Sequence, residues 1–115
     1  MSQNLFIPLL NDKGDDSEIS LHFGHAPYFG LYDLGSKKLV IKKNKLSHSN
    51  PSKTPVDQVV DSANPQIVFA LDMGQRAIRL FKEKNIALKT GSYKILKEVI
   101  ENIKDLKDLS NGCRH

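Results

Sequence analysis

Hydrophobic and polar positions in the first part of the chain predict strands that pair antiparallel. Residues 5–10 form an apolar run typical of a buried strand, and Pro8 within it indicates an edge position or a bulge. An acidic, glycine-containing loop follows at 11–18. Two further segments of alternating polarity, 28–34 and 38–46, flank a Gly-Ser turn and predict a hairpin with one apolar and one lysine-bearing face.

In the second part of the chain, polarity follows the pattern of helices that alternate with strands. A polar connection rich in Ser, Asn, Pro and Lys comes first. The expected elements are a helix from Thr54 to about Ala63, a strand at 66–71, a helix capped by Asp72, a strand at 86–89 and a final helix after Ser92. Such alternation implies parallel strands with helices on the faces of the sheet.

Both later helices are expected to turn an apolar stripe toward the core. The stripes recur at intervals of three and four residues: Met73, Ala77, Leu80 and Phe81 in the first, and Ile95, Leu96, Val99, Ile100, Ile103 and Leu106 in the second. We therefore expect one α/β domain with a mixed sheet of about five strands, an antiparallel N-terminal part and about three helices on its faces. We place this domain at residues 1–109, followed by a flexible tail at 110–115.

The start of the chain and its cysteine content bear on the cellular compartment. No basic-then-apolar signal is present, and no apolar run approaches the ~20 residues that span a bilayer. Cys113 is the only cysteine, so no internal disulfide can form, in agreement with a reducing compartment. We expect a cytoplasmic protein that does not bind membranes.

The net charge of +4 comes largely from lysines in one short region. This region contains Lys37, Lys38, Lys42, Lys43, Lys45 and Lys53. It would attract anions such as nucleic acid, an acidic protein or an anionic metal cluster, although lysines beside a strand often only solvate it and guard its edge. Because arginines and base-stacking aromatic residues are not interleaved with these lysines, we expect no nucleic-acid binding.

Two histidines flank a glycine directly before the hairpin. Neutral imidazole binds iron, zinc, nickel and copper, and Gly24 lets the backbone approach a bulky ligand, so His22 and His25 are candidate metal ligands. The alternative is that His22 packs or hydrogen-bonds within a loop while Gly24 only supplies a turn.

Patterns for nucleotide binding and covalent catalysis are not found. The turn at 90–92 lacks the phosphate-loop sequence, no GxGxxG follows the first strand, and no Ser, His and Asp arrangement is evident. The helix starts near Asp72 and Ser92 follow the carboxyl ends of strands, where free N–H groups attract negative charge.

Residues 22–29 read His-Phe-Gly-His-Ala-Pro-Tyr-Phe and resemble the signature His-Phe-Gly-x-Ala-x-x-Phe of the dinitrogenase iron-molybdenum cofactor biosynthesis family. The likeness continues in a glycine-containing loop that opens a helix at 73–77 and in a strand and turn at 84–91, so it covers nearly the whole chain. It implies a ribonuclease-H-like fold. It also implies a role in carrying, storing or inserting iron–sulfur-type clusters or precursors of the iron-molybdenum cofactor.

The same resemblance implies which residues hold the cofactor. The implied cofactor-binding residues are His22, Phe23, Gly24 and His25, and the implied metal ligands are His22, His25, Cys113 and His115. Arginine is common at position 25 in similar proteins, so the mode of holding an anionic cluster differs here. For the C-terminal residues the alternative is an unstructured end with an incidental thiol.

Nucleases with a ribonuclease-H-like fold need a carboxylate on the first strand, and residues 5–10 contain none, so we expect no enzyme. The first hypothesis is a monomeric or weakly oligomeric cluster-binding protein, linked to nitrogen fixation, that works with proteins donating or accepting the cluster. The second is a metal-free interaction or regulatory module that meets an acidic partner through the lysine-bearing hairpin face or the exposed edge of 38–46.

Overall fold

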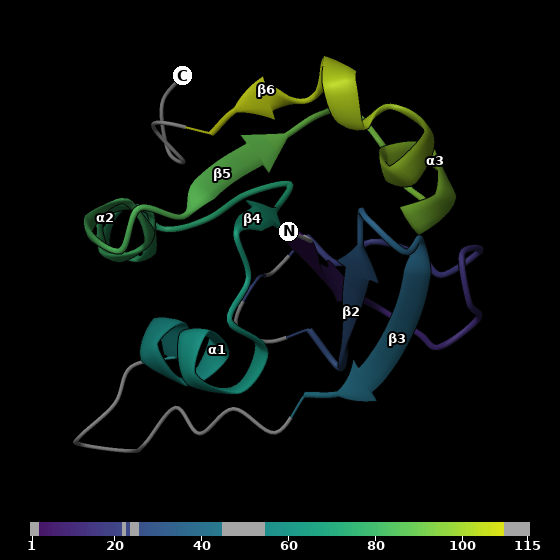
Figure 1. Cartoon of the computed structure of the whole chain (residues 1–115), viewed down its shortest axis with the longest axis horizontal. Helices are drawn as coiled ribbons and strands as arrows, with labels where there is room; N and C mark the ends of the chain where they lie inside the picture. Colours follow the sequence, from purple (N-terminus) through teal and green to yellow (C-terminus); the bar gives the residue numbers. More distant parts are fainter. Residues whose placement is uncertain (1–2, 22, 24–25, 45–54, 110–115) are drawn as a thin grey trace.

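The structure, a computed structural model, describes residues 3–21, 23, 26–44 and 55–109, which fold as one α/β domain (Figure 1). The elements are β1 (Asn4–Leu9), β2 (Tyr28–Asp33), β3 (Lys38–Lys43), α1 (Pro55–Ala63), β4 (Ile67–Phe69), α2 (Gln75–Glu83), β5 (Ala87–Thr90), α3 (Leu96–Glu101), the 3₁₀ helix η1 (Ile103–Asp105) and β6 (Lys107–Asp108). The predicted hairpin and the first helix are confirmed. Thr54, the expected cap of that helix, lies outside the described residues.

All six of these strands form one mixed sheet in the order β3-β2-β1-β4-β5-β6. The first three strands pair antiparallel, β4 and β5 run parallel to β1, and β6 returns antiparallel to β5. The expected antiparallel start and parallel continuation are therefore confirmed. The sixth strand goes beyond the expected five, because a two-residue strand of Lys and Asp has no apolar pattern to reveal it.

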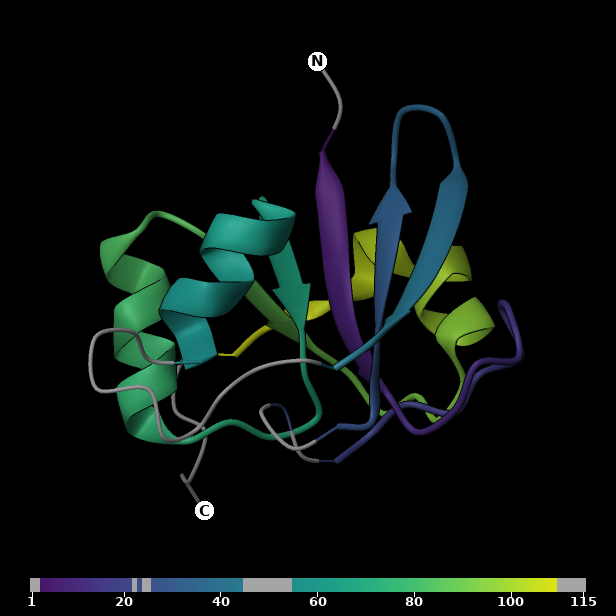
Figure 2. The same ribbon diagram turned by 90° about the horizontal axis from the view of Figure 1, so that it is seen from below.

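The helices cover the sheet from both sides, as Figure 2 shows. Because neighbouring residues of a strand point to opposite faces, β1 contributes to two separate cores. Phe6 packs in a cluster with Val59 of α1 and Phe81 of α2, whereas Ile7 packs in a second cluster with Val99 of α3. Burial of these two apolar faces is the main force that holds the layers together.

Pro8 lies in neither of its two expected settings. The strand that contains it is central, between β2 and β4, and its register with β2 runs without interruption from Asn4 to Leu9. The Pro8 carbonyl accepts the Ser20 N–H, so the backbone groups of Pro8 face away from β2. The proline nitrogen, which has no hydrogen, therefore removes no bond to β2. Pairing with β4 has already ended at Phe6 on that side, which is why a proline is tolerated there.

The last expected helix is shorter than its apolar stripe indicates. Helix α3 ends at Glu101, because Asn102 leaves helical geometry and its side-chain amide donates to the Glu98 carbonyl at 2.8 Å. The chain then continues through η1 into β6. Ile103 and Leu106 still pack against the α3 side of the core, so the apolar spacing predicted the buried face correctly but not the length of the helix.

Candidate functional site

The loop that carries the two candidate histidine ligands leaves the sheet at a fixed point. Ile19 forms an antiparallel bridge with Leu9, and the buried Ser20 donates its N–H to the Pro8 carbonyl at 2.9 Å. Leu21, the next residue, is 55% exposed. The chain therefore turns from the core to the surface immediately before position 22.

Phe23 returns the loop to the core. Its ring is 7% exposed and lies among the rings of Phe6, Phe29 and Phe81, with centroid distances of 5.6, 6.5 and 5.4 Å. Contacts of this kind make Phe23 the anchor of the loop, because a large apolar ring gains most by leaving water. Direct contact of Phe23 with a cofactor stays a prediction.

The far end of the loop is held by Asn44, which directly follows β3. Its side-chain amide donates to the Ala26 carbonyl at 2.6 Å, and its backbone N–H donates to the Pro27 carbonyl at 2.9 Å. Ala26 itself is buried. Asn44 is not among the residues expected from the sequence to build the site. Its only local signal is an amide side chain at the end of a strand, where such groups often bind backbone atoms.

The remaining candidate residues, His22, Gly24, His25, Cys113 and His115, lie outside the described residues. Their role as ligands stays a prediction. Among the residues that the structure describes, no three His, Cys, Asp or Glu side chains are grouped to hold a metal ion. A site built by the candidate residues would therefore draw its ligands from the C-terminal residues and from the signature loop, residues 22–27, which precedes β2.

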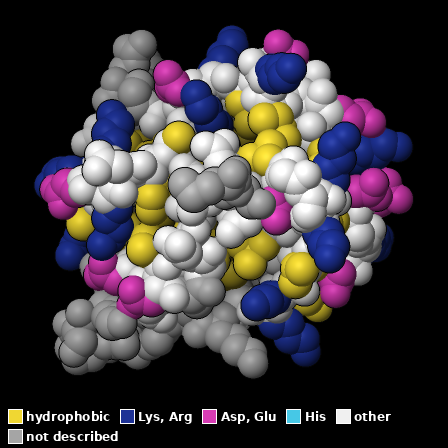
Figure 3. Space-filling view, in the orientation of Figure 1, with side chains coloured by type: hydrophobic (Ala, Val, Ile, Leu, Met, Phe, Trp, Pro, Cys, Tyr) yellow, Lys and Arg dark blue, Asp and Glu magenta, His cyan; other side chains and the backbone are white. Residues whose placement is uncertain are grey.

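The signature loop lies at the carboxyl edge of the parallel strands. Because β1, β4 and β5 run in the same direction, the connections that follow them leave from one edge, and β2 begins and β3 ends at that edge as well. Figure 2 shows the connections after β1 and β4 along the lower side of the sheet. Figure 3 shows the opposite, amino-terminal side, where acidic and basic side chains are interspersed with small apolar areas. Ligands of open α/β sheets usually bind at the carboxyl edge.

The connection from β4 to α2 packs in the same core cluster as Phe23. Its residues Ala70 and Met73 are buried in that cluster. Asp72 was expected to cap the second helix, and this expectation is wrong: its carboxylate accepts the neighbouring Met73 N–H at 2.9 Å, and the helix begins only after Gly74. The predicted stripe of α2 is nevertheless confirmed, since Phe81 is fully buried and Ala77 and Leu80 pack on the cluster.

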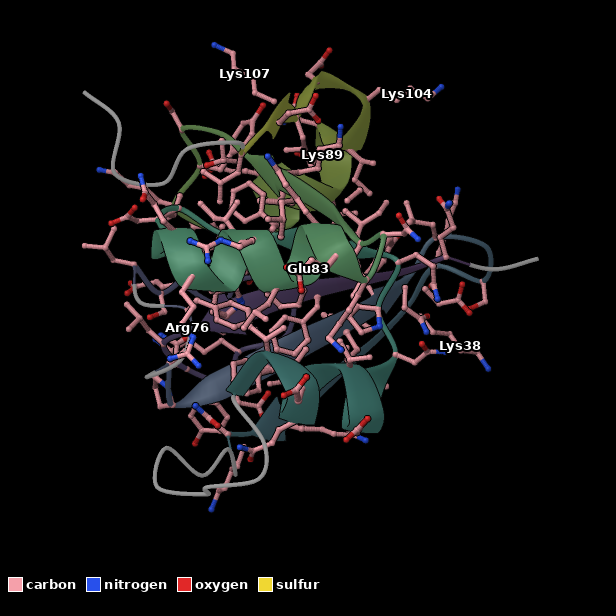
Figure 4. All side chains as sticks on the ribbon, turned by 90° about the vertical axis from the view of Figure 1, so that its left-hand side faces the viewer. Lys38, Arg76, Glu83, Lys89, Lys104 and Lys107 are labelled. Atoms are coloured by element: carbon pink, nitrogen blue, oxygen red, sulfur yellow. The ribbon has the colours of Figure 1, made fainter. Side chains whose placement is uncertain are left out.

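The first turn of α2 is electropositive. No side chain caps it, it contains no acid, and its second residue is Arg76. Figure 4 shows Arg76 at the start of the helix and Glu83 at its end. Uncapped N–H groups and the helix dipole both favour negative charge at this end.

The start of α3 is different, because its N–H groups already have partners. Leu96 and Lys97 donate to the carbonyls of Ser17 and Asp15 at 2.9 and 2.8 Å. The Glu98 carboxylate accepts the N–H groups of Lys94 and Ile95. The expectation of an anion-attracting helix start near Ser92 is therefore wrong, and of the two expected positions only the start of α2 suits an anion.

A mixed sheet with this loop at its carboxyl edge defines a small α/β domain, and comparison with known proteins identifies its family. The profile of the dinitrogenase iron-molybdenum cofactor family matches residues 5–106, so the chain belongs to this family. No curated protein matches the chain. None of the described helices is long and apolar enough to cross a membrane.

Several solved structures share the fold. PH0822 is 26% identical over 93% of this chain and 96% of its own, with a TM-score of 0.73. A NifB-like protein from Thermotoga is 21% identical over 98% of both chains, with a TM-score of 0.79. The apo form of the orange protein from Desulfovibrio gigas is 14% identical over 97% of both chains, with a TM-score of 0.80.

Proposed function

We propose that this protein binds an iron–sulfur-type metal cluster, or a precursor of the iron-molybdenum cofactor, as cargo and carries or stores it for other proteins. Membership of the dinitrogenase iron-molybdenum cofactor family supports a role related to cofactor biosynthesis. The role we infer is an accessory one, without catalytic turnover. Proteins that donate or accept the cluster are its partners.

One observation carries this proposal: the signature loop is held on both sides at the carboxyl edge of the sheet. Its anchor lies in the same core cluster as the connection between β4 and α2, and this connection leads to the electropositive start of α2. Phe23 and Met73 share that cluster, and Phe23 contacts α2 through Phe81. Clusters with thiolate and sulfide ligands are anionic, so a helix start with Arg76 offers charge compensation beside imidazole ligands.

The ligands available to the cluster are His22 and His25, with Cys113 and His115 as additions from the C-terminal residues. Imidazole and thiolate both suit iron in such clusters. A single cysteine is fewer than the four thiolates that a conventional cluster takes. A cluster that is assembled elsewhere, or one that is shared between two chains, therefore fits this donor set better than one built on a single chain.

We also infer that the fold is ribonuclease-H-like, as the family resemblance implies. The antiparallel series β3, β2 and β1, continued by the parallel strands β4 and β5, supports this inference. The first strand of the chain carries no acidic residue. A fold of this kind without that carboxylate supports a binding role over nucleic-acid hydrolysis.

Anaerobic reconstitution with iron and sulfide tests the proposal. The intact protein should develop charge-transfer absorption in the visible range and retain iron after gel filtration, and His22→Ala and His25→Ala should weaken both signals. His48→Ala is the matched control, because it removes an imidazole outside the signature and should leave both signals unchanged. Absence of absorption and of bound iron in the intact protein, offered either as free ions or as a preformed cluster, would contradict the proposal.

A further inference from the structure

We propose that the open edge of β3 binds an extended, acidic segment of a partner protein as an additional strand of the sheet. Strand β3 is six residues long and stands last in the strand order. Among the described residues, β2 is its only paired strand. The opposite edge of the sheet is the two-residue β6, so β3 is the longer of the two templates for strand addition.

The backbone of β3 offers alternating donors and acceptors to such a segment. The Asn44 N–H points to β2, since it donates to the Pro27 carbonyl. In the antiparallel register, the backbone N–H and C=O groups of Lys42 and Val40 also point to β2. The backbone groups of Leu39, Ile41 and Lys43 therefore face the open edge. Three outward-facing residues are enough to form a short ladder with a second chain.

The side chains of β3 specify what kind of segment fits. Lys38, Val40 and Lys42 lie on one face of the strand, and Val40 between the two lysines is 48% exposed. Figure 4 shows Lys38 pointing away from the sheet. Directly opposite side chains interact across strands, so the complementary segment alternates acidic and apolar residues on this face.

The same lysines select against the wrong partner. If β3 paired with β3 of a second copy, the lysines of both chains would lie side by side along the junction of the two strands and repel each other. An acidic segment turns this repulsion into attraction. The charge pattern therefore disfavours self-association and favours an acidic partner, which is how edge strands combine protection with specificity.

The position of β3 links this edge to the signature loop. The strand ends at the carboxyl edge, where the next residue, Asn44, holds the Ala26 carbonyl of that loop. A partner strand along β3 would therefore run toward the loop. Naming this partner as a donor or acceptor of the cluster rests on the proposed function, whereas binding of the acidic segment does not.

A metal-free peptide assay tests the inference directly. The probe is a fluorescein-labelled ten-residue peptide, Glu-Thr-Val-Thr-Glu-Thr-Val-Thr-Glu-Thr, which as a strand carries Glu and Val alternately on one face. It is titrated with the intact protein at low salt and followed by fluorescence anisotropy. We expect saturable binding that weakens about tenfold or more in Lys38→Glu/Lys42→Glu and falls with added salt. The matched control Lys97→Glu/Lys104→Glu reverses the same charge near α3 and should leave the affinity within about twofold.

A second pair of variants separates strand addition from general charge attraction. Ile41→Pro removes an outward N–H without removing a bond to β2, and Ile41→Ala shortens the side chain but keeps that N–H. We expect Pro to abolish binding and Ala to retain it. A peptide with an N-methyl group at every residue has no N–H donor on either edge. It makes the same test on the unaltered protein and should not bind.

Nuclear magnetic resonance locates the bound peptide independently. The amide signals of residues 39, 41 and 43 should shift most on titration. Lack of saturable binding, equal binding of the N-methylated peptide, or shifts spread over all surface lysines would each overturn the inference. Because the assay contains no metal, its failure is distinguishable from a failure of cluster reconstitution.

Discussion

The ring of Phe23 meets the ring of Phe81 edge-on, with the centroids 5.4 Å apart and the planes perpendicular. This contact joins the signature loop to α2. A shift of the helix along its axis would move the anchor of the loop with it, because close-packed rings transmit displacement. The position of the loop is therefore a property of the core and not of the surface chain alone.

Replacing Phe23 should destabilise the whole domain. Phe23→Ala removes a buried ring and leaves a cavity, so we expect the free energy of unfolding to fall by about 3–5 kcal/mol, measured by urea denaturation. Phe23→Leu keeps most of the volume and should cost less. Leu21→Ala, at the neighbouring exposed position, should stay within about 0.5 kcal/mol of the parent. Equal effects of Phe23→Ala and Leu21→Ala would show that the ring is not part of the core.

Asn44 should stabilise the attachment of the signature loop to the end of β3. Asn44→Ala removes the side-chain hydrogen bond to the Ala26 carbonyl, and we expect a loss of about 1 kcal/mol in the free energy of unfolding. Amide hydrogen exchange should accelerate at Ala26 and at neighbouring loop residues more than in β4. Asn44→Asp places an acceptor against the carbonyl and should cost at least as much. Unchanged exchange in both variants would contradict a closing role for Asn44.

Local polarity was enough to predict the larger part of the fold. The alternation of polar and apolar residues in the hairpin and the apolar spacing of α2 predicted the buried faces correctly. A face that packs must be apolar at the period of its element, two residues for a strand and about 3.6 for a helix. Pro8 shows the limit of this reasoning. Its tolerance in a central strand depends on where pairing with β4 stops, which is a property of the tertiary structure.

The candidate site was predictable only as a stretch of sequence. The histidines stood out by residue type, but Asn44 follows β3 and Phe81 lies in α2, and nothing in the local sequence shows that these two residues hold the loop. The start of α3 is instructive for the same reason. It was expected to attract an anion, yet carbonyls of Ser17 and Asp15 occupy its N–H groups, and only the folded chain brings them there.

Gly30 should be intolerant of any side chain. A Cβ at this position of β2 would lie 3.1 Å from Leu9 Cδ1 and 3.7 Å from Leu96 Cδ2, and both leucines are fully buried. Gly30→Ala should therefore lower the free energy of unfolding by about 1–3 kcal/mol through overpacking, as measured by urea denaturation. The bulkier Gly30→Val should cost more. A valine variant as stable as the alanine variant would mean that α3 can move away from β2 freely.

The ion pair between Lys89 of β5 and Asp108 of β6 should make stability depend on pH in the acidic range. The hydrogen bond and the positive charge of Lys89 lower the pKa of the Asp108 carboxyl below its ordinary value. A carboxyl with a lowered pKa in the folded state stabilises the fold fully above its unfolded pKa of about 3.9 and loses this contribution as the pH falls through the lowered pKa. Lys89 is therefore expected to hold the short edge strand best at neutral pH.

Asp108→Asn tests this dependence. At pH 7 and low salt the variant should melt at a lower temperature than the parent protein, and the two melting curves should converge as the pH falls below the folded-state pKa of Asp108. Added salt at pH 7 should narrow the difference, because the pair is exposed and screened by ions. Asp105→Asn, a nearby exposed carboxylate in η1, is the matched control and should melt with the parent protein at every pH. A difference for Asp108→Asn that stays constant from neutral to acidic pH would show that its charge does not hold β6 to β5.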